Sequence, residues 1–294
     1  MILVTGGTGF IGPKVVHALR AEDRDVRCVV RTPNKAGTLK SWGCDLVEGD
    51  VTDPDSLRAA AEGCDSVVHL VSIITGRRAD FRRVMTAGTQ SLVAAAEAAG
   101  VRRFVLMSAL GVSEQTRALV PYYESKWEME QAVRASGLEH VIFRPSFVFG
   151  RDGGALPLFV KQVRWSPVTP VMGSGKRQLQ PIWVEDVAAF FAAAVDLPAA
   201  ANRTFEIGGP DRVTWNELYE RITRTLGKRR TRMHVPVSVA RVGATVVERL
   251  PKAPLTRDQL TMLEAGDNVC DTAPARAAFG IEPIGLDEQL RRAA

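Results

Sequence analysis

The sequence predicts an α/β protein built on a doubly wound parallel sheet, with a smaller C-terminal α/β lobe. Over the first 150 residues, short apolar runs alternate with longer helical patterns. Such alternation indicates strand–helix–strand units with helices on both faces of a sheet. The runs are almost wholly apolar, as expected for strands that are buried on both faces. After Gly150, prolines at positions 157, 167, 170, 181, 198 and 210 interrupt the rhythm, which indicates a second lobe.

Six strands are expected in the first half, at residues 1–4, 25–30, 44–47, 66–71, 103–107 and 139–143. Helical patterns lie between them at 10–21, at 53–62 behind the N-cap Asp53, and at 80–99. In the second half, helices are expected at 184–195, 215–226, 237–250 and 287–292. The basic stretch 228–232 is interpreted as a solvated loop, with a phosphate or partner site as the alternative.

Composition excludes several classes of protein. The formal charge is +5 and aromatic residues make up 6% of the 294 residues, so a basic stripe with interleaved aromatics, typical of a nucleic-acid binder, is not expected. The four cysteines and four histidines are scattered, and we expect reduced thiols and no metal site. No apolar run reaches the roughly 18 residues of a membrane span, and no signal peptide is expected. We expect a cytoplasmic protein.

The strongest motif is a glycine triplet, Gly6, Gly9 and Gly12, between the first strand and the first helix. Gly6 permits a tight turn, Gly9 lets the backbone approach a pyrophosphate, and Gly12 allows close packing of helix on strand. The helix N-terminus adds free N–H groups and the positive end of its dipole. We therefore expect residues 1–150 to form a dinucleotide-binding Rossmann domain to which a segment near 178–208 returns. Residues 151–294 are expected to form the substrate lobe.

The residue types at the end of the second strand indicate which of the two nicotinamide dinucleotides is bound. An acidic residue there would bind the ribose 2′-hydroxyl of NAD. Here Arg31 and Lys35 stand at and after this point, and two cations suit a 2′-phosphate. NADP(H) is therefore favoured, and NAD(H) remains the alternative. Asp50, after the third strand, is a candidate partner for the adenine amine, unless it only caps a turn.

Three motifs together resemble the extended and atypical short-chain dehydrogenases/reductases, which include the NAD-dependent epimerases and dehydratases. They are the glycine-rich segment 5–12, Tyr122-x-x-x-Lys126, and the segment 144–150 that begins Arg-Pro-Ser. The segments 254–260 and 267–269 are similar to one branch, the NADPH-binding accessory subunit of respiratory complex I and its bacterial relatives. The resemblance implies a wider cofactor site, whose further residues are Thr8, Phe10, Ile11, Val51, Leu70, Val71, Pro145 and Ser146.

By this resemblance, Tyr122 is the acid/base and Lys126, one helical turn later, lowers the pKa of its phenol and holds the nicotinamide ribose. Ser108, after the fifth strand, would hydrogen-bond the substrate oxygen. Taken alone, Tyr122 and Lys126 would be an ordinary exposed helix pair. Thr86 stands where the family often has an asparagine, which puts a proton relay in doubt.

We therefore expect an NADP(H)-dependent oxidoreductase acting on a carbonyl or hydroxyl group of a small-molecule substrate that the sequence does not identify. Gln180 and Trp183 are candidate substrate contacts, with core packing as the alternative for Trp183. The alternative function is a non-catalytic NADPH-binding protein with a structural or assembly role, peripherally associated with a membrane complex. A redox-sensing regulator is less consistent with the Tyr–Lys pair. A monomer and a homodimer both fit the sequence.

Overall fold

The computed structural model describes residues 1–247 and 256–294, which form two structural units. Unit 1 comprises Met1–Pro145, Val184–Ile207 and Thr272–Glu282, and unit 2 comprises Ser146–Trp183, Gly208–Asp271 and Pro283–Ala294. The sequence suggested a limit at residue 150 and a return near 178–208. In the structure the first segment of unit 1 ends at Pro145, and a further segment near the C-terminus joins it.

Unit 1 is built on a seven-stranded sheet in the order β11-β6-β5-β4-β1-β2-β3, and all its pairings are parallel. The strands are β1 (Ile2–Thr5), β2 (Val26–Val30), β3 (Asp45–Glu48), β4 (Ser66–His69), β5 (Arg103–Met107), β6 (Glu139–Pro145) and β11 (Arg203–Ile207). The predicted doubly wound α/β fold is confirmed. The strand order reverses between β1 and β4, and in such sheets ligands bind outside the carboxyl ends of the strands at this point.

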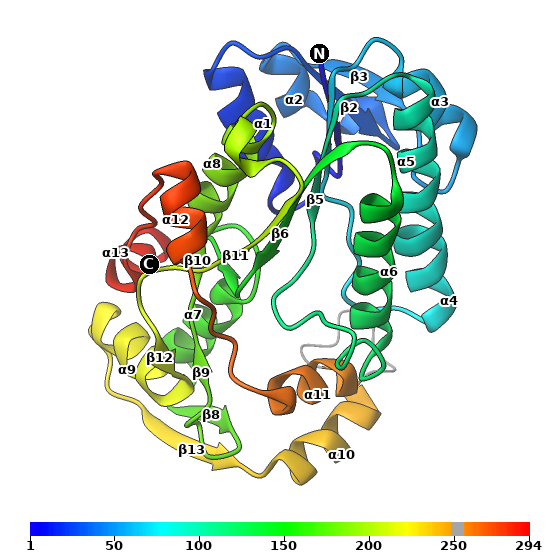
Figure 1. Ribbon diagram of the computed structural model, residues 1–294. Coiled ribbons are helices and arrows are strands. Elements are labelled where there is room, and N and C mark those ends of the chain that lie inside the picture. The colour runs from blue at the N-terminus through cyan, green and yellow to red at the C-terminus, as the bar shows by residue number, and fades with distance from the viewer. Residues whose placement is uncertain (248–255) are drawn as a thin grey trace. The chain divides into compact units, whose positions relative to one another are not determined.

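Helices cover both faces of the sheet (Figure 1), with α3 (Pro54–Ala61), α5 (Gly88–Ala98) and α6 (Pro121–Ala135) on one face and α1 (Gly12–Ala21), α8 (Val184–Ala194) and α12 (Ala273–Phe279) on the other. Shorter turns complete the unit: η1 (Pro33–Lys35), α2 (Gly37–Ser41), α4 (Arg78–Phe81), η2 (Arg82–Ala87) and η3 (Pro198–Ala200). The predicted N-cap is confirmed, because the Asp53 carboxylate accepts a hydrogen bond from the Asp55 amide. The single helix expected at 80–99 is instead divided by the π-helical turn η2.

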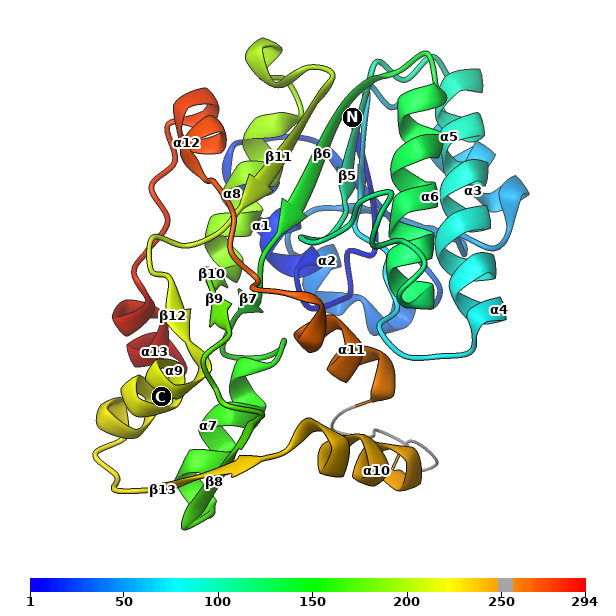
Figure 2. The ribbon, with the colours of Figure 1, turned by 60° about the horizontal axis from the view of Figure 1, so that its bottom comes forward.

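The described residues of unit 2 form three two-stranded ladders. They pair β7 (Val148–Phe149) with β10 (Ile182–Trp183), β9 (Gln178–Leu179) with β12 (Val213–Thr214), and β8 (Val168–Met172) with β13 (Thr231–Val235). Figure 2 shows β8 and β13 side by side. The helices are α7 (Leu156–Trp165), α9 (Trp215–Thr225), α10 (Val237–Val247), α11 (Arg257–Ala265) and α13 (Leu286–Ala293). Residues 248–250 of the expected helix 237–250, and 254–255 of the C-terminal motif, lie outside the described residues.

Each unit has its own apolar core. In unit 1 one core cluster includes Leu3, Val67, Leu92 and Phe104, and in unit 2 the core includes Phe149 and Trp183. Within the described residues, no helix has both the length and the apolar character needed to cross a membrane.

Candidate functional site

The glycine turn after β1 has almost no space for side chains on its inner side. Gly6 has φ +79°, and a Cβ there would lie 3.0 Å from the backbone of Leu70 and Val71. A Cβ on Gly12 would lie 2.2 Å from the Gly6 carbonyl oxygen, closer than any contact permits. At Gly9 the nearest atom to such a Cβ is the Gly6 oxygen at 3.3 Å, and the residue is exposed. The turn thus presents open backbone beside the N-terminus of α1, where a pyrophosphate fits.

The rest of the turn and the end of β4 complete this edge of the sheet. Thr8 is exposed, Phe10 and Ile11 are partly exposed, and Ile11 is the N-cap of α1. Leu70 is buried, Val71 is partly buried, and the Leu70 amide donates to the Thr5 carbonyl. The structure therefore brings the expected residues after β1 and β4 together.

A buried histidine hydrogen-bonds to Thr5, the residue that precedes the glycine turn. It was not identified from the sequence. His69, the last residue of β4, is fully buried between the hydroxyls of Thr5 (2.6 Å) and Thr89 (2.9 Å). Because Thr89 donates its own proton to the Met85 carbonyl, it must accept from Nε2 of His69, so Nδ1 accepts from Thr5. Burial, together with the charge of Lys126, lowers the pKa of His69 to about 3, so the ring is neutral.

The three polar residues expected near the adenosine end lie after β2 and β3. Arg31 and Lys35 are exposed. Oδ1 of Asp50 accepts from the amide and the hydroxyl of Thr52, at 2.9 and 2.8 Å. Burial alone would raise the pKa of Asp50, but the Thr52 hydrogen bonds and the charges of Arg31 and Arg83 lower it. Asp50 thus already has the turn role considered as its alternative, while Val51 behind it is buried.

Tyr122 and Lys126 lie one turn apart on α6. The Lys126 side chain is fully buried, and Nζ donates to the Met107 carbonyl at the end of β5 (2.6 Å). Nζ also lies 5.9 Å from the centroid of the Tyr122 ring. Tyr122 remains partly exposed, and its ring packs edge-on against Phe81. The Lys126 ammonium is therefore fixed near the Tyr122 ring.

The expectation that Lys126 lowers the pKa of the Tyr122 phenol is wrong for this structure. Burial raises the pKa of Tyr122 to about 12, and Tyr123 adds to the rise. Ser72 lies near enough to oppose this rise, although its buried hydroxyl makes no hydrogen bond of good geometry within the described residues. Burial also lowers the pKa of Lys126 to about 7, against the charge of Glu130. A lysine that is only partly charged at neutral pH stabilises a phenolate weakly.

Ser108 directly follows β5, as predicted, but it is already engaged. Its buried hydroxyl donates to Oε1 of Glu130 at 2.5 Å. Glu130 is fully buried and also binds Arg144 through two hydrogen bonds of 2.7 and 2.8 Å and Arg134 at 2.9 Å. A hydrogen bond from Ser108 to a substrate oxygen would have to replace the bond to Glu130. Glu130 was not identified from the sequence, although it lies one helical turn after Lys126.

The remaining predicted residues lie at or beyond the end of β6. Pro145 ends the first segment of unit 1, and its carbonyl accepts from the Leu110 amide. Ser146, in unit 2, donates to Oδ1 of Asn268 at 2.6 Å.

The two candidate substrate contacts are both buried in unit 2. Gln180 uses both ends of its amide, donating to the Gly209 carbonyl (2.7 Å) and accepting from the Cys270 amide (3.0 Å). Trp183 is a member of the core, which favours the packing alternative considered for it.

Thr86, in the π-helical turn, occupies the place where the family often has asparagine. Its hydroxyl donates to Oε2 of Glu128 on α6 at 2.7 Å. This hydrogen bond thus connects η2 to α6, the helix that carries Tyr122 and Lys126.

Comparison with known proteins agrees with this geometry. A family model described as NAD(P)H-binding matches residues 6–198. The chain is 32% identical to a ceramide reductase of Caulobacter vibrioides over 80% of this chain and 74% of that one. It is 28% identical to the photosystem II assembly factor Ycf39 of Synechocystis, covering 96% of this chain and 86% of that one. It is 29% identical to subunit 9 of the NADH dehydrogenase (ubiquinone) 1 alpha subcomplex of Rattus norvegicus, covering 98% and 79%.

Solved structures share the fold at lower identity. The NADPH-dependent quinone oxidoreductase QOR2 of Escherichia coli, solved with NADPH, superposes with a TM-score of 0.81 at 20% identity, covering 99% of this chain and 98% of that one. The match to the family model covers more than half of this chain, from the glycine turn to the residues after α8. The chain therefore belongs to the NAD(P)H-binding family.

Proposed function

We propose that this protein is an NADP(H)-dependent oxidoreductase that interconverts a carbonyl and a hydroxyl group on a small substrate. The observation that carries the proposal is the pair on α6, in which the partly exposed Tyr122 lies one turn before the buried ammonium of Lys126. The relative named ceramide reductase supports a reductive reaction.

The residues of the glycine turn fit a dinucleotide, because Gly6 and Gly12 allow close packing while residues 8–11 are exposed or partly exposed. Gly6, Gly9 and Gly12 would hold the pyrophosphate, and exposed Arg31 and Lys35 would bind a 2′-phosphate. A bound NADP(H) supplies or accepts the hydride.

Within the chain, Tyr122 would move the proton. In reduction its hydroxyl donates a proton to the carbonyl oxygen, and in oxidation its phenolate accepts the hydroxyl proton. A phenol with a pKa of about 12 holds its proton at neutral pH, which suits the reductive direction. Lys126 holds the Tyr122 turn of α6 at the end of β5 through the Met107 carbonyl.

Replacing Tyr122 by phenylalanine tests the proposal. We expect Tyr122→Phe to bind NADPH with a Kd within a few-fold of wild type and to lose turnover by about 10²- to 10⁴-fold. The assay is consumption of NADPH with a panel of aldehydes and ketones. Tyr123→Phe is the matched control, because Tyr123 is the adjacent, buried tyrosine of the same helix and should leave turnover unchanged. Equal loss in both variants, or none in Tyr122→Phe, would contradict the acid/base role.

The second candidate is a non-catalytic NADPH-binding protein that assists a membrane-associated complex. The engagement of Ser108 by Glu130 favours it, as do the relatives named as an assembly factor and as a subunit of NADH dehydrogenase. The discriminating measurement is the dinucleotide released from the purified protein and the rate at which fresh NADPH or NADH replaces it. Rapid exchange with preference for NADP(H) supports the enzyme, whereas stoichiometric NADPH that never exchanges supports the assembly role.

A further inference from the structure

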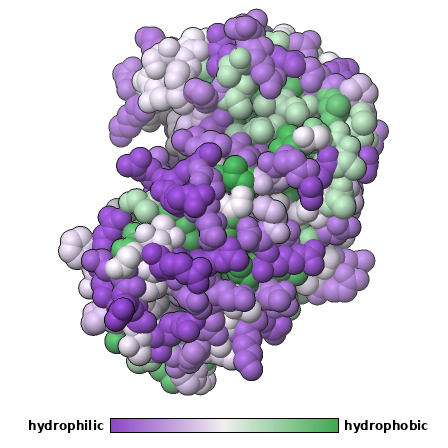
Figure 3. All heavy atoms as spheres, turned by 90° about the vertical axis from the view of Figure 1, so that its left-hand side faces the viewer, coloured by the Kyte–Doolittle hydropathy of each residue, from purple (hydrophilic) through white to green (hydrophobic). Residues whose placement is uncertain are grey.

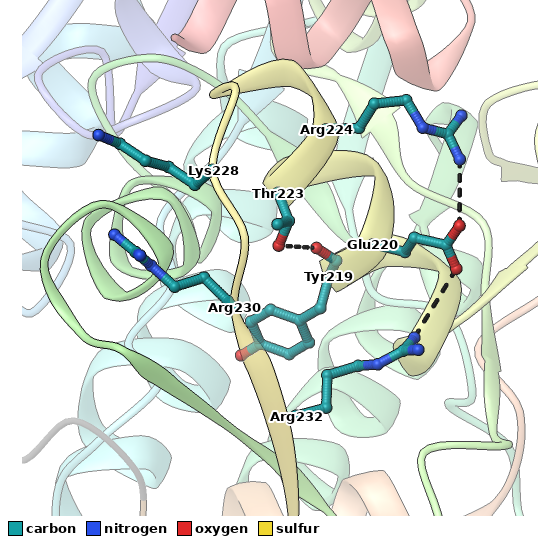
Figure 4. Close-up of a pocket in the computed structure, with 7 residues that line it drawn as sticks. All are labelled: Tyr219, Glu220, Thr223, Arg224, Lys228, Arg230 and Arg232. Carbon is teal, nitrogen blue, oxygen red and sulfur yellow. Dashed lines mark hydrogen bonds and ion pairs between the residues drawn. The ribbon is translucent and has the colours of Figure 1, made fainter.

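A cationic groove lies in unit 2 and is formed without any residue of the dinucleotide or Tyr122 sites. It is a hollow of about 300 Å³ between α9 and the chain that leads into β13. It is lined by Tyr219, Glu220, Thr223, Arg224, Lys228, Arg230 and Arg232. Four cations face one carboxylate, so the lining carries a net charge of +3. This is the basic stretch 228–232 of the sequence, completed by one face of α9 (Figure 4).

The charges of the groove are only partly neutralised. Glu220 is shared by Arg224 at 3.1 Å and Arg232 at 3.8 Å, and Figure 4 shows it between these two arginines. The Lys228 side chain is exposed, and its ammonium makes no hydrogen bond or ion pair with any other described residue. The remaining positive charge of this hollow attracts phosphate groups, which accept several hydrogen bonds at once.

One large exposed side chain follows a residue to which one of these cations binds. Arg230 donates to the carbonyls of Val163 and Arg164, at the end of α7, and the next residue is Trp165, whose surface is 77% exposed. The face in Figure 3, which is the left-hand side of Figure 1, is mainly hydrophilic in its lower part, with small hydrophobic areas at the edge. Tryptophan beside cations is typical of surfaces that enter the headgroup region of a bilayer.

We propose that this groove binds the phosphate of anionic phospholipid headgroups and that Trp165 enters the bilayer interface near it. Charge complementarity selects an anionic lipid surface over a neutral one, and the exposed indole ring of Trp165 selects a lipid over a soluble phosphate. The proposal does not depend on the proposed oxidoreductase activity.

The test is co-sedimentation of the full chain with vesicles of phosphatidylcholine, alone or mixed with phosphatidylglycerol. We expect the wild type to bind the mixed vesicles and salt to weaken this binding. The double variant Arg224→Gln with Arg232→Gln should bind at least about tenfold more weakly, since each cation at such a surface contributes about 1 kcal/mol. Arg291→Gln with Arg292→Gln is the matched control, because these exposed arginines of unit 2 likewise share one carboxylate, Glu288. Lys228→Gln, which removes no interaction with a described residue, should weaken binding about fivefold.

Three outcomes would overturn the proposal. The first is equal binding of wild type and Arg224→Gln with Arg232→Gln, and the second is an equal loss in the control. The third combines two results: inorganic phosphate displaces the protein from the vesicles more than chloride of equal ionic strength does, and Trp165→Ala binds as the wild type does. That result would make the groove a site for soluble phosphates. Far-ultraviolet circular dichroism of each variant establishes that it is folded.

Discussion

At the scale of single residues, the candidate site is defined by what burial does to ionisable groups. Lys126 has lost its water shell, and one of its donors is used on the Met107 carbonyl. Its pKa of about 7, against an ordinary value of 10.5, means that the folded protein binds fewer protons than the unfolded chain between these two pH values. The contribution of Lys126 to stability therefore rises with pH across this window.

The variant Lys126→Met lacks this titration and isolates it. We compare the free energy of unfolding of the wild type with that of Lys126→Met. The wild-type value minus the variant value should increase by about 2 kcal/mol between about pH 7 and pH 9. The slope should reach at most about 1.4 kcal/mol per pH unit. Urea titrations at several pH values measure it. Lys161→Met, at an exposed position of α7, is the control and should show a difference that does not change with pH. A flat difference for Lys126→Met as well would mean that Lys126 keeps an ordinary pKa.

Residue types and spacing predicted which side chains approach the site but not how they are paired. The sequence places Ser108 after a strand and Tyr122 one turn before Lys126, and the structure agrees on these positions. The buried partner of Ser108 is Glu130, and that carboxylate is held in turn by Arg144 from a different strand. A glutamate on a helix usually faces solvent, so only the tertiary arrangement shows that this one is buried.

At the scale of elements, the glycine turn joins β1 to α1 through contacts that exclude a side chain. We expect Gly12→Ala to abolish detectable NADPH binding and to lower the free energy of unfolding by about 1 to 3 kcal/mol, because its Cβ would meet backbone on two sides. Calorimetric titration and urea unfolding measure the two effects. Gly37→Ala is the control, since a Cβ there meets no atom within 4 Å. Wild-type NADPH affinity in Gly12→Ala would refute this account of the turn.

Elements with a clear apolar period were predictable, but proline did not always mark a break. The sequence indicates an interruption at Pro157, yet this residue stands in the first turn of α7, where a missing amide costs nothing. The π-helical turn η2 was also missed, because it differs from an α-helix by one residue of hydrogen-bond register. The strand β11 lies in a region where the sequence indicated only a return to the first domain.

At the scale of the whole molecule, unit 1 is assembled from three separate segments of the chain. Four phenylalanines hold these segments together on one face of the sheet. Phe279 of α12 lies 5.5 Å from Phe143 of β6, 5.4 Å from Phe190 of α8 and 5.1 Å from Phe205 of β11, between ring centroids. Local periodicity carries no information about such long-range pairs, which is why the return of the C-terminal segment was not predicted.

This cluster predicts that a change near the C-terminus will loosen a strand far away in sequence. Phe279→Ala should lower the free energy of unfolding by about 2 kcal/mol, less than for a fully buried phenylalanine because Phe279 is partly exposed. Amide hydrogen exchange should quicken in β11 and at the end of β6 as well as in α12, since the removed ring contacts all three elements. Trp165→Ala removes an aromatic ring that is 77% exposed, and it should change stability by no more than about 0.5 kcal/mol. If exchange in Phe279→Ala rose in α12 alone, the contacts of α12 would not stabilise the edge of the sheet, and β11 and β6 would be stable without them.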